Sequence, residues 1–267
     1  MECICLQNVS KKYNGKIVLN NLNKNFSQGQ SVAFVGHNGC GKSTLLKILS
    51  KLVAPTSGKV IYTKPLLFHY IPEKSFPLSL NSRQYLTHMG ALDGLEKNEI
   101  KSKIECFAND FFITDLLDVP MKTLSKGTLQ KVVVIQALLK TPDVLLLDEP
   151  LSGQDSASQK VFIHKINQLR EKNVTIFMSC HERQLVEAIA EKVYTIQNGS
   201  IVEYQYKTEN MYFAILENAN HLPIINTMQK YGSYYSIKIS QKECDKILPK
   251  LLQQGWKLRG LYNEKNN

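Results

Sequence analysis

Apolar residues change their spacing along the chain, and the change falls near residue 205. Before that point, continuous apolar runs at 31–35, 144–147 and 174–178 alternate with stretches of helical spacing. Short continuous runs of this kind are typical of strands that are buried on both faces of a parallel sheet. The pattern therefore predicts an α/β domain over residues 1–205.

Residues 72–123 are richer in helical spacing than the segments around them. We therefore expect a mainly helical insertion there, as part of a helical subdomain over about 73–140.

The chain beyond residue 206 has a pattern of its own, and we expect a separate small α/β domain over 206–267. Strands are expected at 211–216 and 256–262, and a helix at 222–231. A further half-buried strand is expected where apolar positions alternate, at Tyr235, Ile237 and Ile239.

A helix is expected to follow that strand. Ser240 and Glu243 have the spacing of a capping box, and Gly255 suits the helix end. This domain carries no chemical motif, so a regulatory, dimer-bracing or partner-docking role stays open. The expected apolar face of the helix consists of Cys244, Ile247, Leu248, Leu251 and Leu252.

Composition and charge narrow the class of protein. The formal net charge is +10, which suits nucleic acid, an anionic membrane or phosphate-rich ligands, and equally suits lysines that only keep the surface solvated. The first residues show no secretory signal, and no apolar run reaches membrane-spanning length. The six cysteines form no C-x-x-C pair, so we expect a reduced cytosolic chain that acts on membranes only through a partner.

A phosphate-binding loop follows the run at 31–35. The sequence has the form G-x-x-x-x-G-K-[ST] between a strand and a helix, which is the context the motif requires. Glycines let successive N–H groups point at phosphate oxygens, Lys42 can reach the β- and γ-phosphates, and the Ser43 hydroxyl can coordinate Mg²⁺. The expected nucleotide-binding residues are Gly36, His37, Asn38, Gly39, Cys40, Gly41, Lys42, Ser43 and Thr44.

Two carboxylates end the apolar run at 144–147, and a histidine follows the next run. Asp148 is expected to hold Mg²⁺, and Glu149 to polarise the water that attacks the γ-phosphate. An acidic pair alone is more often a solvated strand end, but the upstream loop favours the functional interpretation. His181 is expected to orient that water or contact the γ-phosphate.

The segment Leu124-Ser-Lys-Gly-Thr-Leu-Gln-Lys131 lies ahead of an apolar helical run. Together with the phosphate loop, the acidic pair and His181, it makes residues 1–203 resemble the nucleotide-binding subunit of an ATP-binding cassette (ABC) transporter. The fold implied is that of a P-loop NTPase of the ABC ATPase type, with a β subdomain and a helical subdomain. The resemblance does not extend to the C-terminal unit.

The resemblance implies a head-to-tail dimer in which ATP on one subunit meets the signature segment of the other. Ser125 and the Gly127 N–H would contact the partner's γ-phosphate, at a helix start that suits anions. The loop 152–155, with Asp155, would cross the dimer interface. Tyr13 matches the aromatic residue that stacks on adenine, and His181 the switch histidine.

This chain departs from the family pattern at two places. Lys126 and Thr128 replace a glycine and the glutamine of the usual L-S-G-G-Q, and Glu73 stands where a glutamine is expected. A carboxylate at 73 can still coordinate Mg²⁺ or water, although it cannot donate a hydrogen bond. Both substitutions resemble those of export-type cassettes, so the resemblance points to export.

The resulting hypothesis is an ATPase that drives a separate transmembrane permease from the cytoplasmic face of the membrane. ATP and Mg²⁺ are the expected cofactors, and both a homodimer and a heterodimer with another cassette suit the motifs. One alternative is a soluble ABC ATPase acting on nucleic acid or ribosomes, but the chain has neither a second cassette nor a coiled-coil insertion. A GTPase is disfavoured because N-K-x-D is missing, and no direct nucleic-acid contact is expected.

Overall fold

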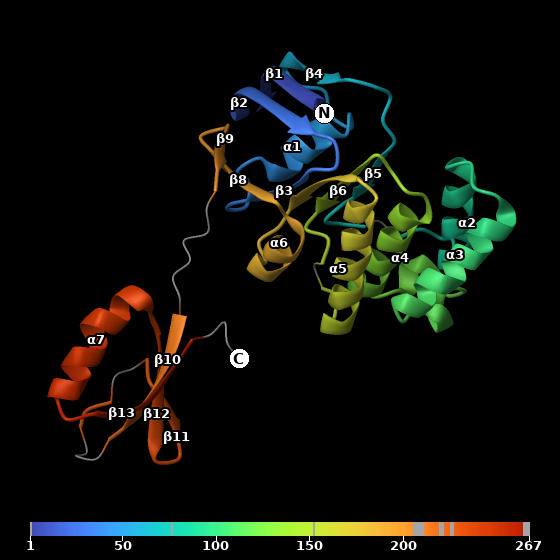
Figure 1. The fold of residues 1–267 in the computed structure, drawn as a ribbon. Helices are drawn as coiled ribbons and strands as arrows, with labels where there is room; N and C mark the ends of the chain where they lie inside the picture. Colours follow the sequence, from blue (N-terminus) through green and yellow to red (C-terminus); the bar gives the residue numbers. More distant parts are fainter. Residues whose placement is uncertain are drawn as a thin grey trace. The chain divides into compact units, whose positions relative to one another are not determined.

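The computed structural model describes residues 2–75, 77–151, 153–204, 211–218, 222–224 and 227–263, without the side chain of residue 242. It divides into two compact units, residues 1–205 and 206–267, which are drawn in Figure 1. All six cysteines are free thiols. No helix in the described parts is both long and apolar enough to cross a membrane.

A six-stranded sheet forms the centre of the first unit, with the order β5–β6–β7–β3–β8–β9. Neighbouring strands are parallel except for β8 and β9. The sheet therefore has the expected parallel character and gains one antiparallel edge strand. Its strands are β5 (Phe68–Ile71), β6 (Val144–Asp148), β7 (Thr175–Ser179), β3 (Ser31–Val35), β8 (Lys192–Gln197) and β9 (Ser200–Glu203).

A three-stranded antiparallel sheet, β2–β1–β4, makes up the N-terminal β subdomain. Its strands are β1 (Glu2–Tyr13), β2 (Lys16–Ser27) and β4 (Ser57–Tyr62). Asn14 and Gly15 join β1 to β2 and have φ of 48° and 79°. Positive φ at both central residues is typical of a two-residue hairpin turn. Phe26 of this sheet meets Phe177 of the central sheet edge-to-face at 4.9 Å, so the two sheets share one core.

Six α-helices accompany these sheets in the described part of the first unit. Three lie in the region that was expected to be helical, and α2 and α3 sit beside α4 in Figure 1. Asn81 and Gln84 form a capping box at the start of α2. The helices are α1 (Lys42–Leu49), α2 (Ser82–Leu92), α3 (Lys97–Asp110), α4 (Lys126–Leu139), α5 (Ser156–Glu171) and α6 (Arg183–Ile189), with short 3₁₀ turns at Thr114–Leu116 and Met121–Thr123.

The second unit is a four-stranded antiparallel sheet, β11–β12–β10–β13, with helix α7 (Gln241–Gln253) packed on one face. Ser240 and Glu243 form the expected capping box. Trp256 packs edge-to-face on Tyr235 in the core of this unit. The strands are β10 (Met211–Glu217), β11 (Gln229–Tyr231), β12 (Tyr234–Ser240) and β13 (Lys257–Asn263).

Two expectations for this unit are wrong. The helix expected at 222–231 is not formed, because 229–231 is strand β11, paired with β12 through a two-residue turn. Gly232 has φ of 60° in that turn, a conformation that continues a hairpin and not a helix. Leu252 is 44% exposed, so it lies outside the buried face of α7 that holds Cys244, Leu248 and Leu251.

Candidate nucleotide site

The phosphate-binding loop joins β3 to α1. Gly36 and Gly41 have φ of 137° and 110°, so the loop has the left-handed turns that glycine permits. The Lys42 side chain is buried, and its Nζ donates to the carbonyl oxygens of Gly36 at 2.7 Å and His37 at 3.2 Å. The loop thus curls around the ammonium group that is expected to bind phosphate.

Asp148 ends β6 in a buried position, and three hydroxyl groups hold its carboxylate. Ser43 Oγ and Ser179 Oγ donate to Oδ1 at 2.8 and 2.6 Å, and Tyr70 OH donates to Oδ2 at 2.8 Å. Burial and the negative charge of Asp148 both raise the pKa of Tyr70, so this phenol stays protonated and keeps donating. Asp148 is therefore fixed beside the hydroxyl of Ser43.

Glu149 follows Asp148 in a left-handed conformation, with φ of 47°. Such a backbone is uncommon for a residue other than glycine and is frequent at functional sites. Its N–H donates to the Ser179 carbonyl at 3.1 Å. Burial raises the pKa of the Glu149 carboxyl above its ordinary value, while the neighbouring His181 and Lys42 side chains act in the opposite direction.

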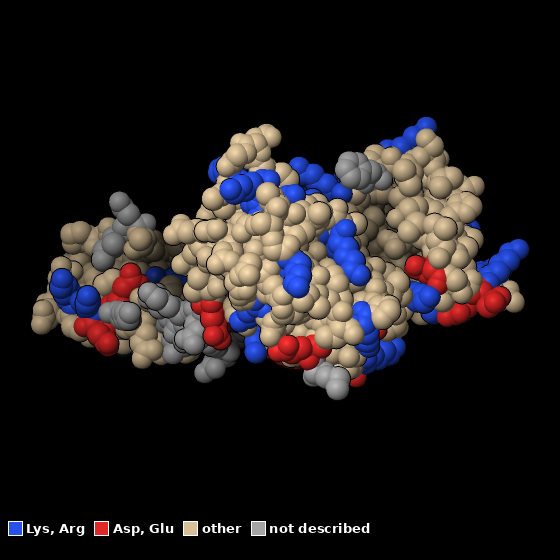
Figure 2. All heavy atoms as spheres, turned by 90° about the horizontal axis from the view of Figure 1, so that it is seen from above, with Lys and Arg blue, Asp and Glu red and all other residues tan. Residues whose placement is uncertain are grey.

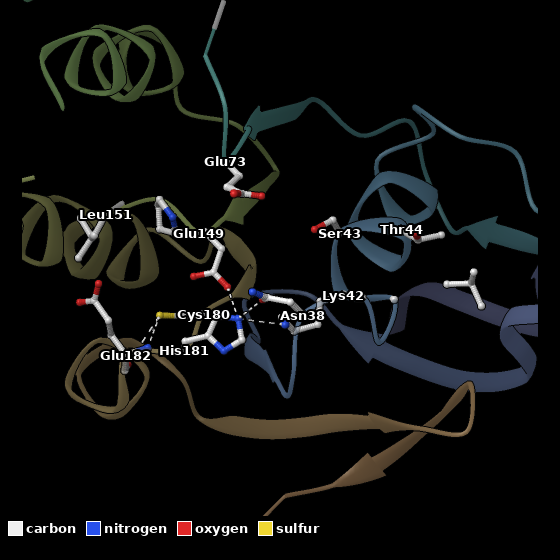
Figure 3. A pocket seen from close by; sticks show the side chains of 14 residues that line it. Asn38, Lys42, Ser43, Thr44, Glu73, Glu149, Leu151, Cys180, His181 and Glu182 are labelled. Atoms are coloured by element: carbon white, nitrogen blue, oxygen red, sulfur yellow. Dashed lines mark hydrogen bonds and ion pairs between the residues drawn. The ribbon is translucent and has the colours of Figure 1, made fainter. Parts of the chain in front are cut away.

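His181 brings the loop and the acidic pair together. Its Nε2 lies 3.1 Å from Glu149 Oε1, 2.9 Å from Asn38 Oδ1 and 3.3 Å from Lys42 Nζ. Figure 3 shows these four side chains converging. The structure therefore brings together the residues expected to hold the γ-phosphate and to activate water.

These groups line a cavity of about 640 Å³. Glu73 lies on its wall and points toward the space between Glu149 and Ser43 (Figure 3). A glycine loop, an ammonium group and a helix start on one wall fit a nucleotide triphosphate. The other lining residues are Val18, Asn38, Gly39, Gly41, Thr44, Pro150, Leu151, Cys180, His181 and Glu182.

The donor set also fits Mg²⁺. Ser43, Asp148 and Glu73 offer oxygen atoms, which this ion prefers. No group of three or more His, Cys, Asp or Glu side chains in the described ranges is arranged as a metal site. Mg²⁺ sites on nucleotides commonly use one or two protein ligands and complete the shell with phosphate and water, so the sparse set is compatible.

Four residues expected in the phosphate loop or at the adenine are not among the described residues that line this cavity: Tyr13, Gly36, His37 and Cys40. Tyr13 is 44% exposed and is not among the described residues that line it; Lys11 Nζ lies 4.9 Å from its ring centroid. His37 and Cys40 line a second cavity of about 560 Å³, together with residues of β2, of β8 and of the turn after β8. The adenine contact of Tyr13 stays a prediction.

The signature segment starts α4. Ser125 caps this helix by accepting from the Thr128 N–H at 3.1 Å. A Cβ on Gly127 would lie 2.4 Å from the carbonyl oxygen of Gly153, so the two glycines let the segment approach the loop after β6. Neither Ser125 nor Gly127 is among the described residues that line the cavity.

Asp155 has contacts within its own chain, and Ser152 lies outside the described residues. Asp155 caps α5 by accepting from the Ser158 N–H at 2.9 Å, and Lys131 Nζ lies 2.9 Å from its Oδ2. These hydrogen bonds lower the pKa of Asp155. A contact of Asp155 with nucleotide stays a prediction, and the observed role of this carboxylate is to join α4 to α5.

Sequence reasoning missed Tyr70, Ser179 and Gln130. Ser179 lies in β7 beside Asp148, so the parallel register of two recognised strands could have revealed it. Tyr70 lies in β5 two residues before Pro72, where the pairing with β6 decides its neighbours. Gln130 gave no signal, because its partners are 55 and 58 residues away in the chain.

Comparison with known proteins gives the family. Residues 19–152 match the family described as ABC transporter. Zinc import ATP-binding protein ZnuC of Mannheimia succiniciproducens is 36% identical, covering 72% of this chain and 71% of the relative. The protein of the same name from Rickettsia bellii is 34% identical, covering 73% and 82%. Both names state import, so the expected export is not supported.

Solved structures show the same fold. A dimeric ATP-binding cassette in a post-hydrolysis state, bound to ADP and Pi, matches with a TM-score of 0.68 at 22% identity. The match covers 76% of this chain and 97% of the cassette. Lys42, Ser43 and Glu149 line one cavity, and this agrees with the family match. The chain belongs to the ABC transporter family, as an ATP-binding subunit that hydrolyses ATP.

Proposed function

We propose that two copies of this chain close head-to-tail around ATP and Mg²⁺ and thereby drive a separate membrane permease. The observation that carries the proposal is the division of the motifs. Lys42, Glu149 and His181 line one cavity, whereas Ser125 and Gly127 are not among its described lining residues. A second copy would supply them, and the dimeric cassette bound to ADP and Pi supports such pairing.

The residues of the cavity have distinct roles in this proposal. Lys42 neutralises the β- and γ-phosphates, and Ser43 with Asp148 and Glu73 provides oxygen ligands for Mg²⁺. When bound, Mg²⁺ would offset the negative charge that develops on the phosphates. Glu149 accepts the proton of the attacking water, and His181, 3.1 Å away, orients this carboxylate.

Charge supports binding of an anionic nucleotide. Residues 1–72 contain nine lysines and one carboxylate, Glu2. Figure 2, seen from the side of β1, β2 and β4, shows Lys and Arg side chains over this part of the first unit. A positive field of this kind raises the local concentration of anions and speeds their association.

The partner would be a permease, with the chain attached to the cytoplasmic face of the membrane. Subunits of this family work with membrane permeases, and the relatives reported above are named as import proteins. The cargo and the direction of transport would then be set by the permease.

Glu149→Gln tests the proposal. Glutamine keeps the size of the side chain but cannot accept the proton, so ATP and Mg²⁺ should hold the variant as a dimer with hydrolysis nearly abolished. Light scattering with and without ATP measures the association, and phosphate release measures turnover. Lys42→Ala is the matched control, because it should bind no ATP and stay monomeric. A Glu149→Gln chain that stays monomeric with ATP and its permease would contradict the proposal.

A further inference from the structure

The side-chain amide of Gln130, in α4, forms hydrogen bonds through both its oxygen and its nitrogen to the segment that follows β5. Its side chain is 1% exposed. Oε1 accepts from Ser75 Oγ at 2.7 Å, and Nε2 donates to the Pro72 carbonyl at 3.0 Å. Because a carbonyl only accepts, the amide orientation is fixed by its partners. Both polar ends of a buried side chain are therefore satisfied by one short segment, residues 72–75.

This segment carries Glu73, which lies on the wall of the nucleotide cavity. Its other end is also anchored, because Tyr70 OH donates to Asp148 Oδ2 at 2.8 Å. Glu73 thus lies between a tether to the carboxylate that ends β6 and a tether to α4. A shift of Glu73 on nucleotide binding would have to move one of these tethers.

The tether to α4 leads to the signature segment. Gln130 begins the second turn of α4, shortly after the cap residue Ser125. A helix moves as one rigid element over a few turns, so a displacement applied at Gln130 reaches its start. The Ser125 end is the part that the proposed dimer presents to the partner's nucleotide.

We propose that Gln130 is a positioning residue that couples the chain's own nucleotide site, at Glu73, to the helix start at Ser125. This inference rests on the proposed dimer. Nucleotide contact at Glu73 then favours the α4 position that closes the dimer, and closure in turn favours nucleotide contact, since coupling between sites is reciprocal. Gln130 itself touches no nucleotide.

The test compares two glutamines of one helix in the Glu149→Gln background. Gln130→Met keeps the length of the side chain and removes both hydrogen bonds. Gln136→Met is the control, because Gln136 is half-buried and has no side-chain hydrogen bond recorded among the described residues. ATP binding at protein concentrations too low for dimerisation, and ATP-driven dimerisation by light scattering, are measured separately.

The expected result is a split between the two measurements. Gln130→Met should bind ATP within about twofold of the parent but need about tenfold more protein or nucleotide to dimerise, as for a lost coupling of ordinary size. Ser75→Ala removes one of the two hydrogen bonds and should give part of the loss. Ser75→Thr keeps the hydroxyl and should restore dimerisation.

The other possible results contradict either the proposed function or the coupling role of Gln130. A parent that does not dimerise with ATP contradicts the proposed function. A parent that dimerises, with Gln130→Met equal to Gln136→Met, contradicts the coupling role alone. Equal losses of ATP binding and dimerisation in Gln130→Met also overturn it, since they show a general structural defect.

Discussion

At the scale of single residues, the site depends on hydrogen bonds between hydroxyl groups and a buried carboxylate. The Asp148 carboxylate accepts from Ser43, Ser179 and Tyr70, so its position is set before any ligand arrives. A buried carboxylate without such donors would be costly. Glu149 has less support: its backbone is in a left-handed turn, and its Oε1 meets His181 at 3.1 Å. Glu149, the residue proposed to accept a proton, is thus less constrained than Asp148.

The raised pKa of Glu149 gives a prediction for the pH dependence of hydrolysis. Only the ionised carboxylate can accept a proton, so kcat should fall as the pH drops through this pKa. Because burial raises it above the ordinary 4.5, the fall should begin at a higher pH than for an exposed glutamate. Phosphate release across pH checks this, and the residual rate of Glu149→Gln should lack the acid limb. If kcat of Glu149→Gln falls at low pH as it does in the parent, the fall must come from the titration of another group.

At the scale of elements, α4 is where the signature segment meets the loop after β6. Gly127 lies in its first turn, and the Cβ of any other residue there would lie 2.4 Å from the Gly153 carbonyl oxygen. The Gly153 carbonyl oxygen is a backbone atom, so it cannot move aside as easily as the end of a flexible side chain. Helix propensity favours alanine over glycine, so here packing and propensity act in opposite directions.

We expect Gly127→Ala to lower the free energy of unfolding of the first unit by about 1–3 kcal/mol, as overpacking does. Gly90→Ala in α2 is the control, since the three atoms nearest to its Cβ would be Ile100 side-chain atoms, at 2.9 to 3.3 Å. Gly90→Ala should lower the free energy of unfolding by less, because the Ile100 side chain can change its conformation. Thermal unfolding followed by circular dichroism compares the two, and equal midpoints would show that the Gly153 loop yields freely.

Elements with a local signal were predictable from the sequence, and those decided by distant pairing were not. The capping box of Ser240 and Glu243 spans four consecutive residues, so the start of α7 could be predicted from the local sequence. The segment 229–231 has no such signal, and its pairing with β12 overrides an apolar spacing that suits a helix. In the site, the strand ends at Asp148 and His181 were evident, whereas Tyr70 and Gln130 depend on strand register and on helix packing.

At the scale of the whole molecule, the described residues of the two units form separate hydrophobic clusters. One includes Phe26, Phe34 and Phe177, and the other surrounds Trp256. Trp256 is the only tryptophan of the chain, and it is 2% exposed against Tyr235. Its fluorescence therefore reports on the core of the second unit, while the nucleotide cavity belongs to the first.

This separation predicts that nucleotide stabilises one unit and not the other. A ligand at about 100 times its Kd adds about 2.7 kcal/mol to the state that binds it. For a unit of this size, that raises the unfolding midpoint by about 5–10 °C. With ADP and Mg²⁺, the transition seen by circular dichroism should shift upward, while the Trp256 fluorescence transition stays in place. Lys42→Ala should abolish the shift. Two transitions that move together would mean that the units unfold as one cooperative structure, because a ligand can stabilise a distant core only through contacts that break in the same step.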